Sequence, residues 1–328
     1  MIIRDNLIVI SLVILIGALF LHCDARGTVV NDRPIIGILS QTEWNDQLIK
    51  HGDAYLAASY VKYIESAGAR VAPVLVNQTQ LYYNKIFNSV NGLLLPGGGQ
   101  LDLLDSGYGR AARYFYDMAM KSYDAGDYFP IWGSCFGFEI LSMLTAGKDL
   151  RTSTRAIDIS YPLNISKDYK SSHLMKDIPN EILKTLTTVS MTFNYHHWGI
   201  SPTNFTKSEE LKNFYRILST NVDENGVEFI STMEAYNYPI YAIMWHAEKN
   251  QFEWNPHKEF RLNHSLEAIQ AVQYFANFFV NEARKNSHKF SSEEEERKHL
   301  IYNFTPVYTA DVVSYEQCYF FQTCSGIR

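Results

Sequence analysis

The sequence predicts an α/β protein built on one doubly wound, mostly parallel sheet with helices on both faces, and with extra antiparallel strands in the second half. Two observations indicate this fold. In the first half of the chain, short apolar runs alternate with amphipathic segments of helical spacing, which is typical of the strand–helix units of a parallel sheet. In the second half, strand-like segments follow one another directly, as antiparallel strands do.

The first half contains the apolar runs expected of buried strands. These runs are short, continuous and uncharged, at residues 34–39, 71–76, 91–95 and 130–133. Helical segments alternate with them, at residues 53–67, 109–123 and 138–145. For the first of these helices we expect Asp53 to cap the start and Gly68 to end it.

The second half is richer in strand. Strands are expected at residues 215–220, 227–234 and 238–248, followed by a long amphipathic helix at about 265–285 and a solvated helix start at 291–299 that Ser291 or Ser292 can cap. A chain of 328 residues can form one large α/β domain or two small ones. Because no internal repeat and no Pro/Gly/Ser-rich linker interrupts it, we expect one domain over residues 26–328.

Residues 1–25 have the pattern of a cleaved signal peptide. Arg4 precedes the apolar run 7–21, and a polar exit begins at His22, so cleavage is expected near residues 23–27. The alternative is a retained membrane anchor, for which the run is short, since a bilayer span needs about 20 apolar residues. A net charge of −6 without a long lysine or arginine tract argues against a nucleic-acid partner.

Glycosylation signals and cysteine usage fit a secretory route. The five Asn-x-Ser/Thr triplets are predicted N-glycosylation sites, at Asn77, Asn164, Asn204, Asn263 and Asn303. If Cys23 leaves with the signal peptide, three cysteines remain, and an odd number leaves at least one thiol unpaired in an oxidising compartment. Cys318 and Cys324 are close in sequence and could form a disulfide if the geometry allows it, which would leave Cys135 free.

Cys135 stands in the segment Gly-Ser-Cys-Phe-Gly, where a predicted strand meets a predicted helix. A nucleophile on a sharp strand-to-helix turn projects clear of the sheet, and Gly133 and Gly137 give that turn room. The start of the helix is expected to lower the pKa of the thiol and to favour the thiolate. The alternative is a buried structural cysteine, which is common in protein cores.

Two further motifs can complete a catalytic site around this cysteine. Residues 96–99, Pro-Gly-Gly-Gly, follow a predicted strand, where backbone N–H groups can approach a reacting carbonyl; the alternative is a simple tight turn. His246 and Glu248 close the strand predicted at 238–248 and, two positions apart, project to the same face. A carboxylate there can hold the imidazole of a general base in one tautomer, although a lone histidine at a strand end is more often structural.

The cysteine turn, the upstream glycine loop and the downstream His-x-Glu together resemble the class I glutamine amidotransferase-like fold. Within that fold the chain is similar to the γ-glutamyl hydrolase family, peptidase family C26. The resemblance runs from about Pro34 to near the C-terminus. It includes segments outside the three motifs, such as residues 57–71, 228–241 and 278–288.

The resemblance implies a catalytic role for three residues. Cys135 corresponds to the nucleophile, His246 to the general base and acid, and Glu248 to the carboxylate that orients the imidazole. The family usually has proline between the histidine and the glutamate, where this chain has Ala247. Proline fixes φ and tightens the bend, so alanine there implies a somewhat looser triad.

The resemblance also implies residues that contact the substrate. The backbone N–H groups of Phe136 and of Gly98 or Gly99 correspond to the oxyanion hole. Glu139 and His196 correspond to positions near the substrate. Their alternative roles are a helix-face acid for Glu139 and a hydrogen-bonded loop histidine for His196.

The implied activity is hydrolysis of γ-glutamyl bonds in poly-γ-glutamates, in particular folylpolyglutamates, through a γ-glutamyl thioester on Cys135. No cofactor or metal is expected, since no Cys/His cluster has metal-ligand spacing. A lysosomal or extracellular location, a small or peptide-like polyglutamate as partner, no membrane contact after signal cleavage and a homodimer are further expectations. The alternatives are another cysteine-dependent γ-glutamyl enzyme, such as a glutaminase or transpeptidase, and a catalytically silent secreted glycoprotein.

Overall fold

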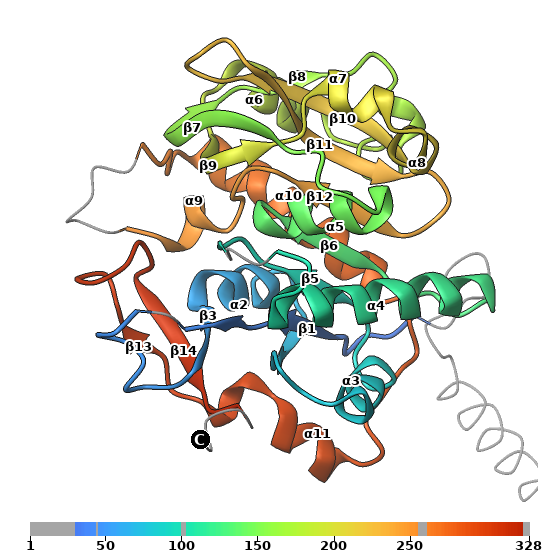
Figure 1. Ribbon diagram of the computed structural model, residues 1–328, viewed down its shortest axis with the longest axis vertical. Coiled ribbons are helices and arrows are strands. Elements are labelled where there is room, and N and C mark those ends of the chain that lie inside the picture. The colour runs from blue at the N-terminus through green and yellow to red at the C-terminus, as the bar shows by residue number, and fades with distance from the viewer. Residues whose placement is uncertain (1–29, 44, 100–102, 255–260, 324–328) are drawn as a thin grey trace, which may run out of the picture.

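The computed structural model describes residues 30–43, 45–99, 103–254 and 261–323 (Figure 1). The predicted signal peptide and Cys324 are outside these residues. Within them, no helix combines the length and the apolar composition that crossing a membrane requires. Cys318 is buried and its sulfur is a free thiol.

An eight-stranded sheet forms the centre of the molecule (Figure 1). In spatial order its strands are β4 (Arg70–Val74), β1 (Ile35–Leu39), β5 (Leu93–Leu95), β6 (Ile131–Ser134), β12 (Ile240–Ile243), β11 (Glu228–Ala235), β10 (Tyr215–Val222) and β8 (Asn164–Ile165). The first five pair in parallel, with the chain order 2-1-3-4-5 that flavodoxin-like sheets have. The last three are antiparallel. This confirms the predicted doubly wound, mostly parallel sheet with antiparallel strands from the second half.

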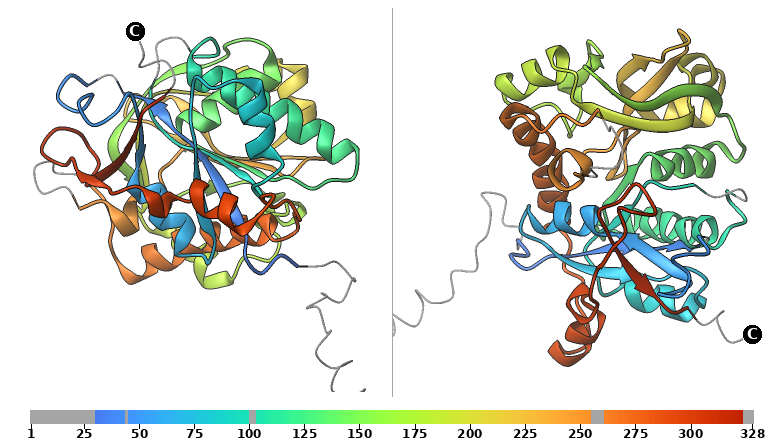
Figure 2. Two further views of the ribbon diagram at one scale, coloured as in Figure 1. Left: turned by 90° about the horizontal axis from the view of Figure 1, so that it is seen from below. Right: turned by 90° about the vertical axis from the view of Figure 1, so that its left-hand side faces the viewer.

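Helices cover both faces of this sheet (Figure 2, right). On one face α4 (Gly107–Asp124) packs against both α3 (Gln80–Phe87) and α5 (Phe136–Ala146), and on the other α2 (Ala58–Glu65) packs against α10 (Leu266–Ala283). Serine or threonine side chains cap α3, α4 and α10 by accepting a hydrogen bond from an N–H in the first turn. The remaining helices are α6 (Asn180–Thr188), α7 (Pro202–Lys207), α8 (Glu209–Phe214), α9 (Lys249–Phe252) and α11 (Glu293–His299).

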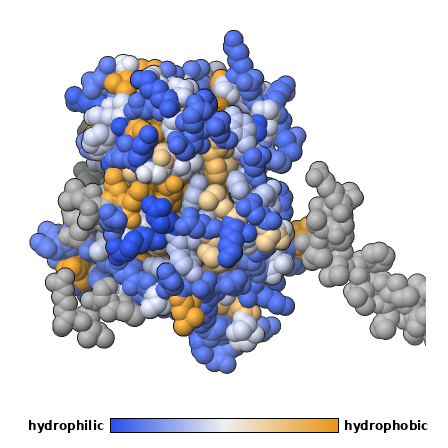
Figure 3. Space-filling model, turned by 45° about the vertical axis from the view of Figure 1, so that its right-hand side comes forward, coloured by the Kyte–Doolittle hydropathy of each residue, from blue (hydrophilic) through white to orange (hydrophobic). Residues whose placement is uncertain are grey.

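The core is one continuous cluster of apolar side chains between the sheet and its two helical layers. Every residue of β1, β5, β6 and β12 is buried, which is why these strands read as unbroken apolar runs in the sequence. Aromatic rings join the layers: Trp132 of β6 contacts Phe275 and Phe279 of α10. On the face shown in Figure 3, most residues are hydrophilic and the apolar ones gather near the middle.

Two smaller sheets complete the fold, and neither was predicted. One is an antiparallel pair of β7 (Thr152–Tyr161) and β9 (Thr192–Gly199). The other has the order β13-β14-β3-β2 and joins β2 (Gln41–Thr42) and β3 (Ala54–Ala57) with β13 (Val307–Tyr308) and β14 (Gln317–Phe321). In the second sheet, β3 from the early part of the chain pairs with β14, more than 250 residues later.

The predicted helix at 53–67 begins later than expected. Residues 54–57 form β3 instead, because this segment pairs with β2 on one side and β14 on the other, and such pairing overrides local propensity. Asp53 is therefore not a helix cap; its carboxylate accepts hydrogen bonds from the backbone and hydroxyl of Thr323. Gly68 does follow the helix, with a φ of 85°.

Candidate active site

Three neighbouring parallel strands end at the same edge of the main sheet. β5 runs into the loop 96–99, β6 into Cys135, and β12 into the turn that contains His246. The carboxyl ends of parallel strands form the crevice in which such sheets bind ligands. A Cβ added to Gly97 would be 2.6 Å from Cε1 of His246 and 3.1 Å from Cβ of Cys135. The three motifs predicted to form a site are thus in contact with one another.

Cys135 occupies a strained turn between β6 and α5. Its φ of 50° and ψ of −105° are a backbone conformation that residues with side chains rarely adopt. Its N–H donates to the carbonyl oxygen of Ile243, at 2.8 Å, which ties the turn to β12. Gly137 lets α5 approach β5, because a Cβ there would be 2.1 Å from the carbonyl oxygen of Leu95. The chain therefore has the strand–turn–helix geometry of a nucleophile elbow, although Cys135 itself is buried.

The thiol of Cys135 does not have the lowered pKa expected from the start of a helix. Burial raises the pKa of this thiol well above its ordinary value, and the carboxylates of Glu139 and Glu248 add to the shift. The Phe136 N–H, hydrogen-bonded to the sulfur, and the Lys249 ammonium act in the opposite direction but do not outweigh burial. In the substrate-free protein the sulfur is a thiol, so a base must take its proton before it can attack.

That base is available in the buried pair of His246 and Glu248. Nδ1 of His246 is 2.7 Å from Oε1 of Glu248, so this nitrogen donates to the carboxylate and Nε2 is left for proton transfer. Burial alone would raise the pKa of Glu248, but the charge and the hydrogen bond of His246 outweigh it and the pKa is lowered. Glu248 is therefore ionised and can stabilise an imidazolium.

His246 and Glu248 meet in a turn and not on one face of a strand as predicted. β12 ends at Ile243, and residues 246–248 form a turn leading into α9, so strand alternation does not place them. The N–H of His246 instead donates to the carbonyl oxygen of Phe193 in β9, at 2.8 Å. The strand is shorter than its apolar pattern because the chain bends here to join β9 and α9.

Ala247 is expected to tolerate the family's proline. Its φ is not positive, and no acceptor for its N–H is found among the described residues, so proline removes no hydrogen bond there. Ala247→Pro should keep kcat/KM equal or higher and should stabilise the fold by about 0.4–1 kcal/mol, measured by activity assay and thermal unfolding. Ala242→Pro, inside β12, is the matched control and should unfold at lower temperature. A misfolded Ala247→Pro protein would show that the turn departs from the family's geometry.

The glycine loop is held from two sides. The hydroxyl of Tyr108 donates to the carbonyl oxygen of Pro96 at 2.9 Å, and the side-chain amide of Gln41 donates to the carbonyl oxygen of Gly97. These two hydrogen bonds fix the orientation of both carbonyls. Sequence reasoning missed both residues, although Gln41 had one signal, its position directly after the first predicted strand.

The N–H groups predicted for an oxyanion hole belong to the glycine loop and to the start of α5. Gly98 and Gly99 are exposed, and their N–H groups have no acceptor among the described residues. The N–H of Phe136 points at the sulfur from the first position of α5. Backbone N–H groups that are free to donate near a nucleophile can stabilise negative charge on a carbonyl oxygen under attack.

Tyr60 joins the glycine loop to the imidazole. Its hydroxyl oxygen accepts a hydrogen bond from the N–H of Gly97 at 2.7 Å and lies 3.3 Å from Nδ1 of His246. The tyrosine is buried, and burial raises the pKa of its hydroxyl well above the ordinary value. Tyr60 is therefore a neutral residue that fixes the spacing between the loop and the base, a role that helical spacing alone did not reveal.

Glu139 lies near Cys135, and His196 lies near His246. Glu139 is in the first turn of α5, where burial raises the pKa of its carboxyl to about 7 against the opposing effect of Arg151. His196 is on β9 rather than on a loop; its ring nitrogens contact the hydroxyl of Thr154 at 3.0 Å and the amide oxygen of Asn194 at 3.2 Å. Burial, and then the charge of His246, lowers the pKa of His196 to about 3. These contacts favour the structural role for His196.

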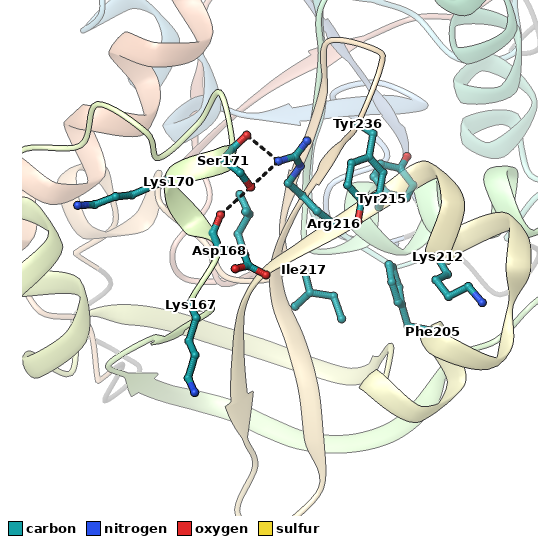
Figure 4. Close-up of a pocket in the computed structure, with 11 residues that line it drawn as sticks. Lys167, Asp168, Lys170, Ser171, Phe205, Lys212, Tyr215, Arg216, Ile217 and Tyr236 are labelled. Carbon is teal, nitrogen blue, oxygen red and sulfur yellow. Dashed lines mark hydrogen bonds between the residues drawn. The ribbon is translucent and has the colours of Figure 1, made fainter.

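A second concave region is remote from this site. A cavity of about 560 Å³ is lined by the start of β10 and by η1 (Tyr169–Ser171), at the opposite edge of the sheet from Cys135. Figure 4 shows its lysines pointing apart, while Arg216 is hydrogen-bonded to Ser171. No cysteine or histidine lines this cavity. Within the described parts of the chain, no group of His, Cys, Asp and Glu side chains could hold a metal ion.

Comparison with known proteins places the chain in one family. The peptidase C26 model matches residues 34–248. Human gamma-glutamyl hydrolase is 47% identical over 289 residues, covering 88% of this chain and 90% of that protein. The Bos taurus gamma-glutamyl hydrolase is 46% identical over 308 residues, covering 94% and 96%. Among solved structures, PurLQS from Thermotoga maritima aligns with a TM-score of 0.41 at 14% identity, over 73% of this chain and 97% of that chain.

Proposed function

The chain belongs to the γ-glutamyl hydrolase family, peptidase C26, and hydrolyses γ-glutamyl bonds; we propose that Cys135 does so on poly-γ-glutamates, in particular folylpolyglutamates. The observation that supports this assignment is the meeting of three motifs at one sheet edge. A Cβ built on Gly97 would be within 3.1 Å of both Cys135 and His246, and Oε1 of Glu248 is 2.7 Å from Nδ1 of His246.

The first half-reaction forms a thioester. Nε2 of His246 takes the proton of the Cys135 thiol, and the sulfur attacks the γ-carbonyl carbon. The N–H groups of Phe136 and of Gly98 or Gly99 donate to the oxygen as it becomes negative. When the C–N bond breaks, the imidazolium returns its proton to the leaving amine. Because the thiol pKa is raised by burial, proton removal by the imidazole is a required part of the attack.

The second half-reaction regenerates the enzyme. His246, neutral again, takes a proton from water, and the resulting hydroxide attacks the thioester carbonyl held by the same backbone donors. The C–S bond breaks, and the imidazolium returns a proton to the sulfur. Glu248 keeps the imidazole in one tautomer throughout and stabilises its charged form.

Product analysis tests the assignment. A pteroyl-polyglutamate incubated with the protein should give shorter pteroyl-glutamates together with glutamate or a γ-linked oligomer, identified by mass spectrometry. Cys135→Ser is the control and should give none. Ammonia release from free glutamine at a higher kcat/KM than polyglutamate cleavage would favour the glutaminase alternative. Absence of cleavage of either substrate would favour the silent glycoprotein.

The raised pKa of the Cys135 thiol predicts how the protein reacts with iodoacetamide. A group whose pKa is raised keeps its proton to higher pH, so the thiolate fraction should still be increasing at pH 9. The inactivation rate should therefore climb by about tenfold per pH unit between pH 7 and 9, where an ordinary thiol of pKa about 8.5 already levels off. Denatured protein serves as the reference. A rate that is already constant below pH 7 would show that the free enzyme holds a thiolate.

The proposal also covers location and assembly. A cleaved signal and glycans predict a secretory route to the lysosome or the outside of the cell, and Asn164 and Asn303 are the exposed sequon asparagines. N-terminal sequencing should find the mature chain starting near residues 23–31, and glycosidase should lower the apparent mass. A homodimer is expected from the family resemblance, and sedimentation analysis at assay concentration tests it.

A further inference from the structure

Arg151 lies beside the predicted substrate residue Glu139 and is fixed in place. Its Nη1 is 2.8 Å from a carboxylate oxygen of Glu139, and its Nε and Nη2 donate to Asp149 at 3.0 and 2.9 Å. The guanidinium carbon is 5.1 Å from the centre of the Trp198 ring. The side chain is 12% exposed, so it is a largely buried cation that still reaches the surface.

The guanidinium keeps donors that these contacts do not use. Arginine has five N–H groups, and the two carboxylates take one from each of its three nitrogens, which leaves one on Nη1 and one on Nη2. A pair of N–H groups on the two Nη atoms is the fork that binds a carboxylate in two parallel hydrogen bonds. The indole of Trp198, itself 45% exposed, bounds the same region with an aromatic face.

The substrate brings a matching group to this region. Every residue of a γ-linked polyglutamate has a free α-carboxylate, four bonds from its γ-carbonyl carbon, which is roughly 5 Å by ordinary bond lengths. Glu139 is in the first turn of α5, and its backbone N–H donates to the carbonyl oxygen of Cys135 at 3.1 Å, so its side chain starts one helical turn from the nucleophile. The α-carboxylate of the attacked residue therefore reaches the Glu139 side of the site.

Glu139 alone would make this a poor place for an anion. Its carboxyl is buried, and a second carboxylate beside it would meet no compensating charge. Arg151 changes that balance, because it brings a positive charge to Glu139, which it shares with the more exposed Asp149. Burial raises the pKa of Glu139 to about 7, so below neutral pH this carboxyl is largely protonated and competes less for the guanidinium.

We propose that Arg151 binds the α-carboxylate of the glutamyl residue whose γ-carbonyl Cys135 attacks, and so selects γ-glutamyl over uncharged acyl groups. The proposal rests on the proposed function. Arg151 acts as a specificity-determining residue, with Glu139 and Asp149 holding the guanidinium and Trp198 covering one of its faces.

Two substrates that differ in one group test this proposal. One is pteroyl-glutamyl-γ-glutamate, and the other has 4-aminobutyrate in place of the attacked glutamyl residue, which removes only the α-carboxylate. For Arg151→Ala, KM for the first substrate should rise by roughly ten- to a hundredfold while kcat changes by less than about threefold. Its kcat/KM for the 4-aminobutyrate analogue should equal that of the wild type. Arg151→Lys should give an intermediate KM, since it keeps the charge but loses the fork.

The chain offers a matched control and a second variant. Arg155 is in β7, which begins just after Arg151. Its side chain is 68% exposed and pairs with Glu224, so Arg155→Ala should leave the kinetics on both substrates unchanged. Because Arg151→Ala leaves Glu139 without its partner, the double variant Glu139→Gln/Arg151→Leu removes both charges, and it should show the same loss of preference. Thermal unfolding of each variant confirms the fold.

Three results would overturn the inference. An Arg151→Ala protein that prefers the γ-glutamyl substrate as strongly as the wild type excludes α-carboxylate binding. Equal losses on both substrates would give Arg151 a structural role only. If the wild-type protein is as inactive on both substrates as Cys135→Ser, the proposed function itself fails. If the wild type cleaves the γ-glutamyl substrate and Cys135→Ser does not, the proposed function stands, and only the role of Arg151 is then in question.

Discussion

His246→Ala should lower kcat by about four orders of magnitude or more, because nucleophile and base act as one unit and the thiol pKa is too high for the sulfur to attack unaided. Glu248→Gln should cost less, on the order of one to several powers of ten, since a neutral amide can still hold the ring. His197→Ala is the matched control: this exposed histidine on β9 is outside the proposed site, and its loss should leave kcat unchanged.

The alanine variant leaves Glu248 buried without its partner, which can destabilise the fold. The double variant His246→Ala/Glu248→Gln contains no unpaired charge and should be as inactive as His246→Ala. Single-turnover kinetics on a pteroyl-polyglutamate would measure both. A folded His246→Ala protein with wild-type turnover would rule out the mechanism, and an inactive, folded Glu248→Gln protein would give the carboxylate more than an orienting role.

Gly97→Ala should reduce kcat/KM by about a hundredfold or more. The new methyl group would be 2.6 Å from Cε1 of His246 and 2.7 Å from the hydroxyl oxygen of Tyr60, and both side chains are buried and rigidly held. The imidazole has to move away from the cysteine, and a displacement of about 1 Å in such a site costs on the order of 10² in rate.

Gly99→Ala provides the comparison for Gly97→Ala. An added Cβ at Gly99 meets no described atom within 4 Å, and alanine keeps the backbone N–H that the oxyanion hole requires. Kinetic measurements on both variants should find Gly99→Ala close to wild type. If Gly97→Ala were as active as the wild type, the glycine loop would not touch the base in the working enzyme.

The parallel half of the sheet was predictable because burial on both faces leaves a plain signal. β1, β5 and β6 are short apolar runs in the sequence and fully buried strands in the structure. β3 was missed because residues 54–57 have helical spacing, and only the distant partner β14 makes them a strand. The β7–β9 pair was missed because burial does not alternate regularly along either strand, so neither has a clear apolar face in the sequence.

The candidate site likewise contains residues that the sequence could predict and residues that it could not. Cys135 and His246 could be found from motifs because their chemistry requires particular residue types beside glycine or a carboxylate. Tyr60 and Gln41 contact residues far away in the chain, and Arg151 is identified by its hydrogen bond to Glu139. No local sequence pattern indicates any of these contacts. The direction of the Cys135 pKa was wrong for the same reason, since the helix start is visible in the sequence and the depth of burial is not.

The small sheet β13-β14-β3-β2 links the support of the glycine loop to a strand that is far away in the sequence. Gln41, which holds the glycine loop, is in β2; β2 pairs with β3, and β3 pairs with β14. The ribosome delivers β14, residues 317–321, long after β2 and β3. Until then β3 is an open edge, and the loop beside Cys135 lacks its finished support. We therefore expect the glycine loop to gain its full support late in folding, when β14 docks against β3.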